Sequence, residues 1–346
     1  MLGVMSGTSL DGIDLVGVNF VCGETWEFSI EAAQTIGYTD VWRDRLANLH
    51  QASETQIRAE NEVYTKFLAK TILEFIEAHN LREIEAVCSH GHTLFHQPEK
   101  GYTFQLGNIK KLAEFLGYPV VCDFRIQDVA LGGQGAPLVP IGDQLLFSEY
   151  DACLNLGGFA NVSKTIEGQL IAYDLAAVNT VLNTLSQKKG KPYDKGGQWA
   201  KKGSLIFPFF KALETLDFYN KEAPKSLGIE WLDSEIFPLL DKYKTEKIDD
   251  LLHTYAVHIG KQIGASFRSN IKVLATGGGV KNDFLMQQIK AHSAAEIIIP
   301  TEEIVDFKEA LIFALLGVLR LRDEINCLSS VTGSSKDHST GIIYFP

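Results

Sequence analysis

A polar turn near the N-terminus contains the residue types that bind phosphate and a divalent cation. The segment Gly3 to Asp14 reads GVMSGTSLDGID, with glycines, hydroxyls and two carboxylates close together. Glycine has no Cβ and tolerates positive φ, so several backbone N–H groups can point at one anion, while an aspartate can hold hydrated Mg²⁺. These residues indicate a phosphate site on a hairpin, although an ordinary polar β-turn uses the same residue types.

The turn matches neither of the common nucleotide-binding loops. It lacks G-x-x-x-x-G-K-[ST] and G-x-G-x-x-G, and it leads into Val16, Val18 and Phe20. Their period of two predicts a strand over 15–20, where a P-loop would be followed by a helix. A further strand is expected over 25–33.

Two more glycine turns follow strand-like runs. Gly157 and Gly158 come after an expected strand at 152–156, and Gly277, Gly278 and Gly279 lie between an expected strand at 272–275 and an expected helix at 283–291. Consecutive glycines let the backbone approach a flat or anionic group closely. We therefore expect these turns to bind a nucleotide together with the first one.

A charged cluster follows an expected buried strand at 118–124. Asp123, Arg125 and Asp128 precede the glycine loop 132–137. Such a sequence costs stability unless it lines a functional site, so it favours a site over a structural turn.

Three histidines, His90, His92 and His96, follow an expected buried strand at 83–89 and invite a metal hypothesis. There is no H-E-x-x-H and no nearby cysteine ligand, so hydrogen bonding to a sugar or within the core is favoured.

The order of elements repeats in the two halves of the chain. Residues 1–148 and 149–346 each begin with a strand, a polar glycine turn, two more strands and a helix, which predicts a duplicated α/β domain. The helices expected from apolar periodicity are 60–80, 109–116, 141–147, 178–187, 248–267 and 305–320.

Composition narrows the class of protein. The 346 residues, 45% of them hydrophobic, are enough for about two domains. A net charge of −11 argues against nucleic acid or an anionic membrane as a partner, and there is no apolar run long enough to cross a bilayer. We expect a soluble cytoplasmic protein whose five scattered cysteines are reduced core residues.

Together these motifs identify a resemblance to one family. The chain resembles the anhydro-N-acetylmuramic acid kinases along nearly its whole length. The motifs that carry the resemblance are MSGTSLDGID (5–14), SHGHT (89–93), DFR (123–125), GGQGAPLVP (132–140), LNLGGFANVS (154–163), TGGGVKN (276–282), FKEA (307–310) and SVTG (330–333). The resemblance implies a duplicated actin-like (ribonuclease H-like) two-domain fold, each half a mixed sheet flanked by helices, with an interdomain cleft.

The resemblance also implies an activity. Such a kinase uses ATP, Mg²⁺ and water to convert 1,6-anhydro-N-acetylmuramic acid into N-acetylmuramic acid 6-phosphate in murein recycling, and is a homodimer. Its catalytic base falls on Asp174, and Thr93, Arg125 and Glu309 would bind the sugar. Asp11 or Asp14 would reach the metal through water. The residues expected to bind nucleotide are Gly7, Thr8, Ser9, Leu10, Asp11, Gly12, Ile13, Asp14, Gly157, Gly158, Gly277, Gly278 and Gly279.

The chain departs from the family at one motif. Where the family has D-T-G-P-G-N, residues 174–179 read DLAAVN, which keeps Asp174 and Asn179 but neither glycine. We expect this loop to turn with negative φ and to keep the carboxylate in place. Two alternatives remain: another sugar or acetate kinase of the same superfamily, or a nucleotide-binding relative without catalysis.

Overall fold

The computed structural model describes residues 1–7 and 9–346, and the chain forms two compact units. The first contains Met1–Phe147 and Phe307–Pro346, and the second contains Ser148–Asp306. The sequence led us to expect halves at 1–148 and 149–346. The observed units place 307–346 with the first half instead, because the C-terminal strand pairs in the first sheet.

The first unit is built on a mixed sheet with the strand order β12-β6-β4-β1-β2-β3, and β5 pairs with β4 outside this path. Its strands are β1 (Leu2–Ser6), β2 (Gly12–Cys22), β3 (Trp26–Gly37), β4 (Val87–Gln97), β5 (Tyr102–Leu106), β6 (Val120–Cys122) and β12 (Ile342–Tyr344). Its helices are α1 (Asp40–Asn48), α2 (Glu54–Ala78), α3 (Lys111–Leu116), α4 (Ile126–Ala130), α5 (Pro140–Leu146), α15 (Ser329–Thr332) and the part of α14 (Glu302–Leu321) from Phe307 on.

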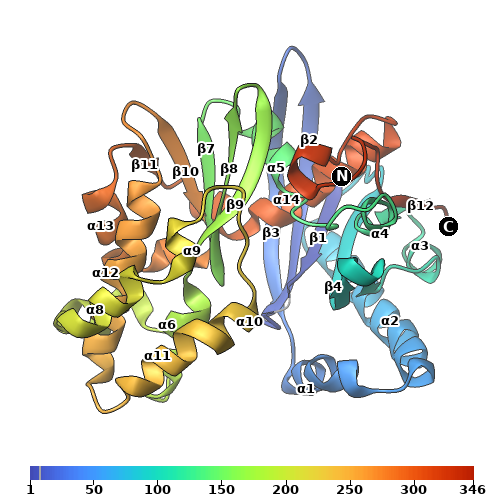
Figure 1. Ribbon diagram of the computed structural model, residues 1–346. Helices are drawn as coiled ribbons and strands as arrows, with labels where there is room; N and C mark the ends of the chain where they lie inside the picture. The colour runs from blue at the N-terminus through green and yellow to red at the C-terminus, as the bar shows by residue number, and fades with distance from the viewer. Residues whose placement is uncertain (8) are drawn as a thin grey trace. The chain divides into compact units, whose positions relative to one another are not determined.

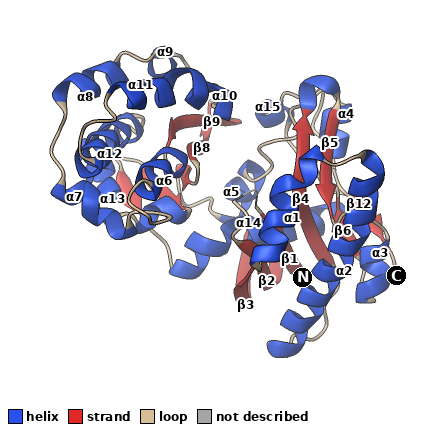
Figure 2. Cartoon of the chain, turned by 90° about the horizontal axis from the view of Figure 1, so that it is seen from below, coloured by secondary structure: helices blue, strands red, loops and turns tan. Residues whose placement is uncertain are grey.

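The second unit has the strand order β11-β10-β7-β8-β9. Its strands are β7 (Ala152–Leu156), β8 (Phe159–Ile166), β9 (Gln169–Ala177), β10 (Lys272–Thr276) and β11 (Glu296–Ile298). Its helices are α6 (Asn179–Gln187), α7 (Gln198–Lys202), α8 (Phe207–Glu214), α9 (Asp217–Asn220), α10 (Ile229–Trp231), α11 (Phe237–Lys242), α12 (Ile248–Ala265) and α13 (Asp283–His292). In Figure 2, α6, α12 and α13 lie around this sheet.

The two sheets repeat one topology. β1, β2 and β3 form an antiparallel meander, and β4 and β6 add to β1 in parallel. β7, β8 and β9 form the corresponding meander, and β10 and β11 add to β7 in parallel. The expected duplicated α/β fold, with a mixed sheet and flanking helices in each half, is confirmed.

Each sheet contributes one side of a separate hydrophobic core. In the first unit, Leu68, Ile72 and Phe75 of α2 are almost fully buried in the same cluster as Leu2 and Val4 of β1. In the second, α12 buries Tyr255, Ile259 and Ile263 in a cluster with Leu154 of β7. Burying one apolar stripe of a helix on a sheet is the main source of stability in such layers.

Helix α14 lies close to the first strand of the chain. Figure 1 shows the red α14 beside the blue β1. A Cβ on Gly3 would lie 2.0 Å from Ala310 O, so only a glycine permits this approach of strand to helix. The contact places the neighbouring Glu309 beside the sheet of the first unit.

Several boundaries differ from expectation. We expected a strand at 83–89 followed by a turn, but β4 runs from Val87 to Gln97 because residues 92–97 pair with β5. Helix α2 begins at Glu54, six residues earlier than expected, because Ser53 and Gln56 form a capping box. Cys22 is exposed, whereas the other cysteines are buried as expected. Within residues 1–7 and 9–346, no helix combines the length and apolar character that crossing a lipid bilayer requires.

Candidate active site

The expected phosphate turn connects β1 to β2. Met5 pairs with Asp14 and Ser6 with Ile13, so the hairpin closes directly around residues 7–12. Leu10 has a φ of 60°, which is uncommon for a residue with a side chain, and its N–H donates to Gly7 O at 3.4 Å. Thr8 lies outside the described residues. The tight geometry expected of this turn is therefore present.

A buried hydrogen-bond cluster supports the end of β1. Ser6 Oγ lies 2.7 Å from Tyr38 OH and 3.1 Å from His92 Nδ1, and Tyr38 OH lies 2.7 Å from Tyr64 OH. Burial lowers the pKa of His92 to about 4, so its ring is neutral at pH 7. Sequence reasoning missed both tyrosines, because neither belongs to a recognisable motif: Tyr38 follows the end of β3 and Tyr64 lies in the middle of α2.

Arg125 is held by two fixed partners just after β6. Its Nε donates to His90 Nε2 at 3.0 Å, and its Nη1 donates to Gly135 O at 2.5 Å. Burial lowers the pKa of Arg125 to about 10, and Glu309 opposes that effect. His90 Nδ1 donates to Gly91 O at 2.8 Å, so Nε2 is the acceptor for Arg125. The guanidinium is thereby oriented before any ligand binds.

Glu309 lies within electrostatic range of this guanidinium and of Asp14. Burial raises the pKa of Glu309, the cations Lys308 and Arg125 lower it, and Asp14 raises it. Lys308 itself makes a buried ion pair with Asp143, with 2.9 Å between Nζ and Oδ1. The first unit therefore brings together three residues that we expected in the site, namely Asp14, Arg125 and Glu309.

Thr93 and the three histidines lie along β4. Thr93 is half-buried and pairs with Gln105 of β5. His90, His92 and His96 contact Arg125, Ser6 and Thr103 respectively through ring nitrogens. These contacts agree with the hydrogen-bonding interpretation that we favoured over a metal site.

The glycine loop 132–137 folds around a carboxylate. Asp128 is fully buried, and its Oδ2 accepts a hydrogen bond from Gly135 N at 2.7 Å. A Cβ on Gly133 would lie 2.2 Å from the same oxygen, so the loop encloses Asp128 closely. Because Gly135 O in turn holds Arg125, the loop helps to position the guanidinium.

In the second unit, Asp174 is fixed by a segment that sequence reasoning missed. Its N–H donates to Lys225 O at 2.8 Å, and its Oδ2 accepts from Leu227 N at 2.7 Å. Burial raises the pKa of Asp174, and the hydrogen bond from Leu227 lowers it in part. A bulge in the pairing of β8 with β9 places Asp174 opposite Asn161. Asp174 is a half-buried carboxylate with a raised pKa, as a general base requires.

The altered loop after Asp174 turns without left-handed backbone. Ala176 and Ala177 continue β9, and Val178 has φ −116° and ψ −94°. The N–H groups of Val178 and Asn179 donate to Gly158 O and Gly157 O at 2.8 and 3.2 Å. This chain therefore keeps the connection between β9 and α6 without glycines at these positions.

The two glycine turns of the second unit meet around Leu156. Asn179 Nδ2 donates to Leu156 O at 3.2 Å, and a Cβ on Gly279 would lie 2.7 Å from Leu156 Cβ. Gly277 has φ 84° and ψ 162°, which is open to glycine alone, and a Cβ there would lie 2.4 Å from Asn155 Oδ1. The unit thus brings Gly157, Gly158 and Gly277–Gly279 together as one glycine-lined surface.

Comparison with known proteins assigns the chain to a class of enzyme. A family model described as anhydro-N-acetylmuramic acid kinase matches residues 1–346. Curated proteins of that name include one from Actinobacillus pleuropneumoniae serotype 5b, 32% identical over 365 residues covering 99% of this chain and 98% of the relative. Another, from Pasteurella multocida, is 33% identical over 366 residues covering 99% and 96%. The protein is therefore a kinase. It belongs to the anhydro-N-acetylmuramic acid kinase family.

Solved structures show a more distant likeness. The activator of 2-hydroxyisocaproyl-CoA dehydratase from Clostridium difficile with bound ADPNP has a TM-score of 0.42 and 13% identity, covering 90% of this chain and 95% of that one. A ROK family glucokinase from Streptomyces griseus in complex with glucose and AMPPNP has a TM-score of 0.38 and 12% identity, covering 86% and 93%.

Proposed function

We propose that the protein phosphorylates 1,6-anhydro-N-acetylmuramic acid with ATP and opens the anhydro bridge with water. The product is N-acetylmuramic acid 6-phosphate, formed as a step in murein recycling. The observation that carries the proposal is that Asp174, the residue on which the family's base falls by motif resemblance, is a half-buried carboxylate oriented by Leu227 N. Membership of the kinase family over residues 1–346 supports it.

In the proposed reaction one base serves two bond changes. Asp174 takes a proton from water through Oδ1 while Oδ2 keeps its hydrogen bond to Leu227 N. The water oxygen attacks the anomeric carbon and the bond from that carbon to O6 breaks. O6 attacks the γ-phosphorus in line, and ADP leaves. Burial of Asp174 favours proton uptake, because it raises the pKa of the carboxyl group.

ATP is the proposed phosphoryl donor. The glycine-lined surface of the second unit, formed by Gly157, Gly158 and Gly277–Gly279, allows close approach of the nucleotide to the backbone. In the first unit, backbone N–H groups of the turn 7–14 are the proposed donors to phosphate oxygens, where they would stabilise charge on the transferred group.

The turn 7–14 also suits a hard cation. Asp11 is exposed, and Asp14 is half-buried with its Oδ1 accepting from Thr35 Oγ1, so both present carboxylate oxygens of the kind Mg²⁺ prefers. Asp11 or Asp14 would hold Mg²⁺ through water, and the ion would supply positive charge against the phosphates.

Residues of the first unit are the proposed sugar ligands. Arg125, already oriented by His90 and Gly135, would bind an anionic or polar substituent of the sugar. Glu309 and Thr93 would hydrogen-bond to the ring substituents. As in the family, we propose a cytoplasmic homodimer with ATP and an amino sugar as its small-molecule partners.

The test is mass spectrometry of the product formed in ¹⁸O-labelled water. Coupled hydrolysis is expected to give a phosphorylated sugar with one ¹⁸O at the anomeric position and none in the phosphate. N-acetylmuramic acid 6-phosphate incubated in the same water without enzyme measures spontaneous exchange at that position. A product that retains the anhydro bridge, or label equal to the exchange control, would contradict the proposal in favour of direct phosphorylation.

A further inference from the structure

A second group of reactive side chains lies in the first unit and is not proposed to touch the substrates. Among the described residues, Asp128 of α4, Cys327 and His338 bring a carboxylate oxygen, a sulfur and an imidazole nitrogen within 4.8 Å of one another. All three residues are buried. Carboxylate, thiolate and imidazole are the ligand types of protein zinc sites.

The distances within the group suit a tetrahedral ion. Cys327 Sγ lies 3.2 Å from Asp128 Oδ1, and His338 Nε2 lies 3.7 Å from the same oxygen. Zinc bonds of about 2.0 to 2.3 Å at tetrahedral angles separate neighbouring ligand atoms by about 3.3 to 3.6 Å. The distances between the ligand atoms are therefore close to those around a tetrahedral zinc ion, and the backbone would not need to move for the ion to bind.

His338 presents a lone pair to the other ligands. Its Nδ1 lies 3.1 Å from Lys336 O, and because a carbonyl can only accept, Nδ1 carries the hydrogen. In the neutral ring Nε2 is the acceptor, and within residues 1–7 and 9–346 this buried atom has no hydrogen-bond partner, only Asp128 Oδ1 at 3.7 Å. A buried acceptor that faces a carboxylate costs stability unless a cation lies between them. A histidine that donates its other N–H to a backbone carbonyl is also typical of metal ligation.

The backbone holds the ligands in place. Cys327 and His338 form an antiparallel bridge with N···O distances of 3.1 and 3.0 Å, so their side chains stand side by side. Asp128 is oriented by hydrogen bonds from Thr332 Oγ1 at 2.6 Å and from Gly135 N at 2.7 Å. Outer hydrogen bonds of this kind fix the ligands of a metal centre.

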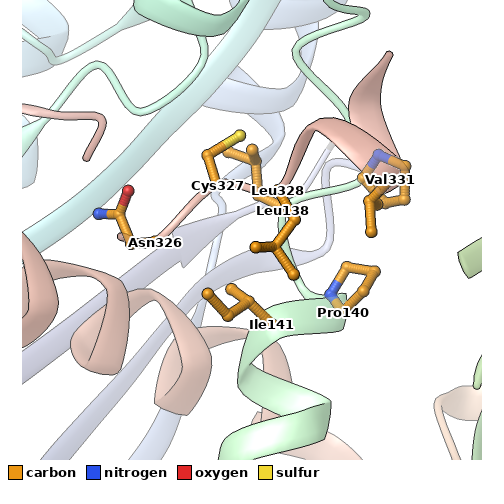
Figure 3. A pocket seen from close by; sticks show the side chains of 8 residues that line it. Leu138, Pro140, Ile141, Asn326, Cys327, Leu328 and Val331 are labelled. Atoms are coloured by element: carbon orange, nitrogen blue, oxygen red, sulfur yellow. The ribbon is translucent and has the colours of Figure 1, made fainter. Parts of the chain in front are cut away.

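The pocket next to Cys327 is too small to be a substrate site. It has a volume of about 10 Å³ and is lined mainly by apolar side chains from the segments 137–141 and 326–331. Figure 3 shows the Cys327 sulfur at the end of the side chain away from Pro140 and Ile141. A cavity of this size holds about one water, so the group is closed by apolar residues on this side.

We propose that Asp128, Cys327 and His338 bind one Zn²⁺ ion, with a water as the fourth ligand. The thiol releases its proton to solvent when the metal–sulfur bond forms, so the ion and the two anionic ligands balance in charge. The ion joins α4 to the segment that contains Cys327 and His338, which lies 199 or more residues further along the chain. Two of its ligands, Asp128 and Cys327, lie within electrostatic range of Arg125, and Asp128 also holds Gly135 N, but the ion would not touch the sugar, so its role is structural.

The test measures zinc binding by the full chain with and without the proposed ligands. Chelator-treated protein is titrated with Zn²⁺ and, separately, with Co²⁺, whose thiolate charge-transfer absorption reports a metal–sulfur bond. The variants are His338→Gln and Cys327→Ala. Cys122→Ala is the matched control, because Cys122 is also a buried cysteine of the first unit.

The proposal expects one Zn²⁺ per chain and a cobalt–thiolate band. Each ligand variant should weaken binding by more than about a hundredfold, since loss of outer partners alone costs up to that much. The Cys122 variant should bind like the parent. Failure of the parent protein to bind Zn²⁺ would overturn the proposal, as would unchanged binding in both ligand variants. The cobalt titration needs only the parent protein, so it decides the question even if a variant fails to fold.

Discussion

Gly277→Ala should damage both the stability of the second unit and its binding of ATP. Gly277 has φ 84° and ψ 162°, and an alanine there would cost roughly 1 to 3 kcal/mol in backbone strain alone. Its Cβ would also lie 2.4 Å from Asn155 Oδ1 and 3.0 Å from the Leu156 carbonyl, so the surface shared by the glycine turns must shift. With overpacking of roughly 1 to 3 kcal/mol, the total is about 2 to 6 kcal/mol.

Gly168→Ala is the matched control. Gly168 has φ 81° in the turn between β8 and β9, but its Cβ would point into open space, so the substitution should cost only the backbone strain of roughly 1 to 2 kcal/mol. Urea unfolding gives both free energies, and calorimetric titration with a non-hydrolysable ATP analogue gives the affinities. The control should bind the analogue like the parent, and Gly277→Ala should bind it at least tenfold more weakly. Equal stability and equal affinity in the two variants would refute the reasoning.

Three further predictions concern catalysis and charge. Asp174→Asn should lower kcat for the anhydro sugar by about 10²- to 10⁴-fold while ATP still binds, and because burial raises the pKa of Asp174, parent kcat should fall on acidification at a higher pH than an exposed aspartate would give. A variant as fast as the parent would exclude Asp174 as the base. Burial raises the pKa of Glu214, but hydrogen bonds from His258 and Lys261 outweigh this effect and lower the pKa from 4.5 to about 2. Since the folded pKa is depressed, Glu214 contributes stability that is present above pH 4.5 and is lost as the pH falls toward 2. Unfolding curves of Glu214→Gln should lack this slope, and an unchanged slope would contradict the assignment. Lys308→Met should destabilise the protein by roughly 3 to 5 kcal/mol because it leaves the buried Asp143 without its cation, and Lys308→Met combined with Asp143→Leu should recover most of that loss in urea unfolding. A single variant as stable as the parent would show that the pair contributes little.

Features that depend on neighbouring residues were predictable from the sequence. The glycine turn after β1 and the meander in each half follow from turn residues between strands of period two. The strand expected at 152–156 is β7 with the same bounds. Glu309 was recognised through its motif, and the structure places it within electrostatic range of Arg125.

Features that depend on distant pairing were not predictable. β4 continues through His92 to Gln97 because β5 supplies its hydrogen-bond partner, which overrides the turn that the polar residues indicate. The contacts of Asp128 with Cys327 and Thr332 join residues 199 and 204 positions apart, and no periodicity in a sequence reports such a contact. The hydrogen bond from Leu227 N to Asp174 Oδ2 likewise comes from a segment that contains no recognisable motif.

The pairing of β12 with β6 has a consequence for synthesis on the ribosome. The second unit is one continuous stretch, Ser148–Asp306, whereas the first needs Phe307–Pro346 in addition to the first residues translated. Domains fold as their residues emerge from the ribosome. We therefore expect the second unit to complete its core before β12, the last strand of the first sheet, has been synthesised. A premature stop codon near the end of the message would therefore expose the edge of β6 in the half of the molecule that was made first.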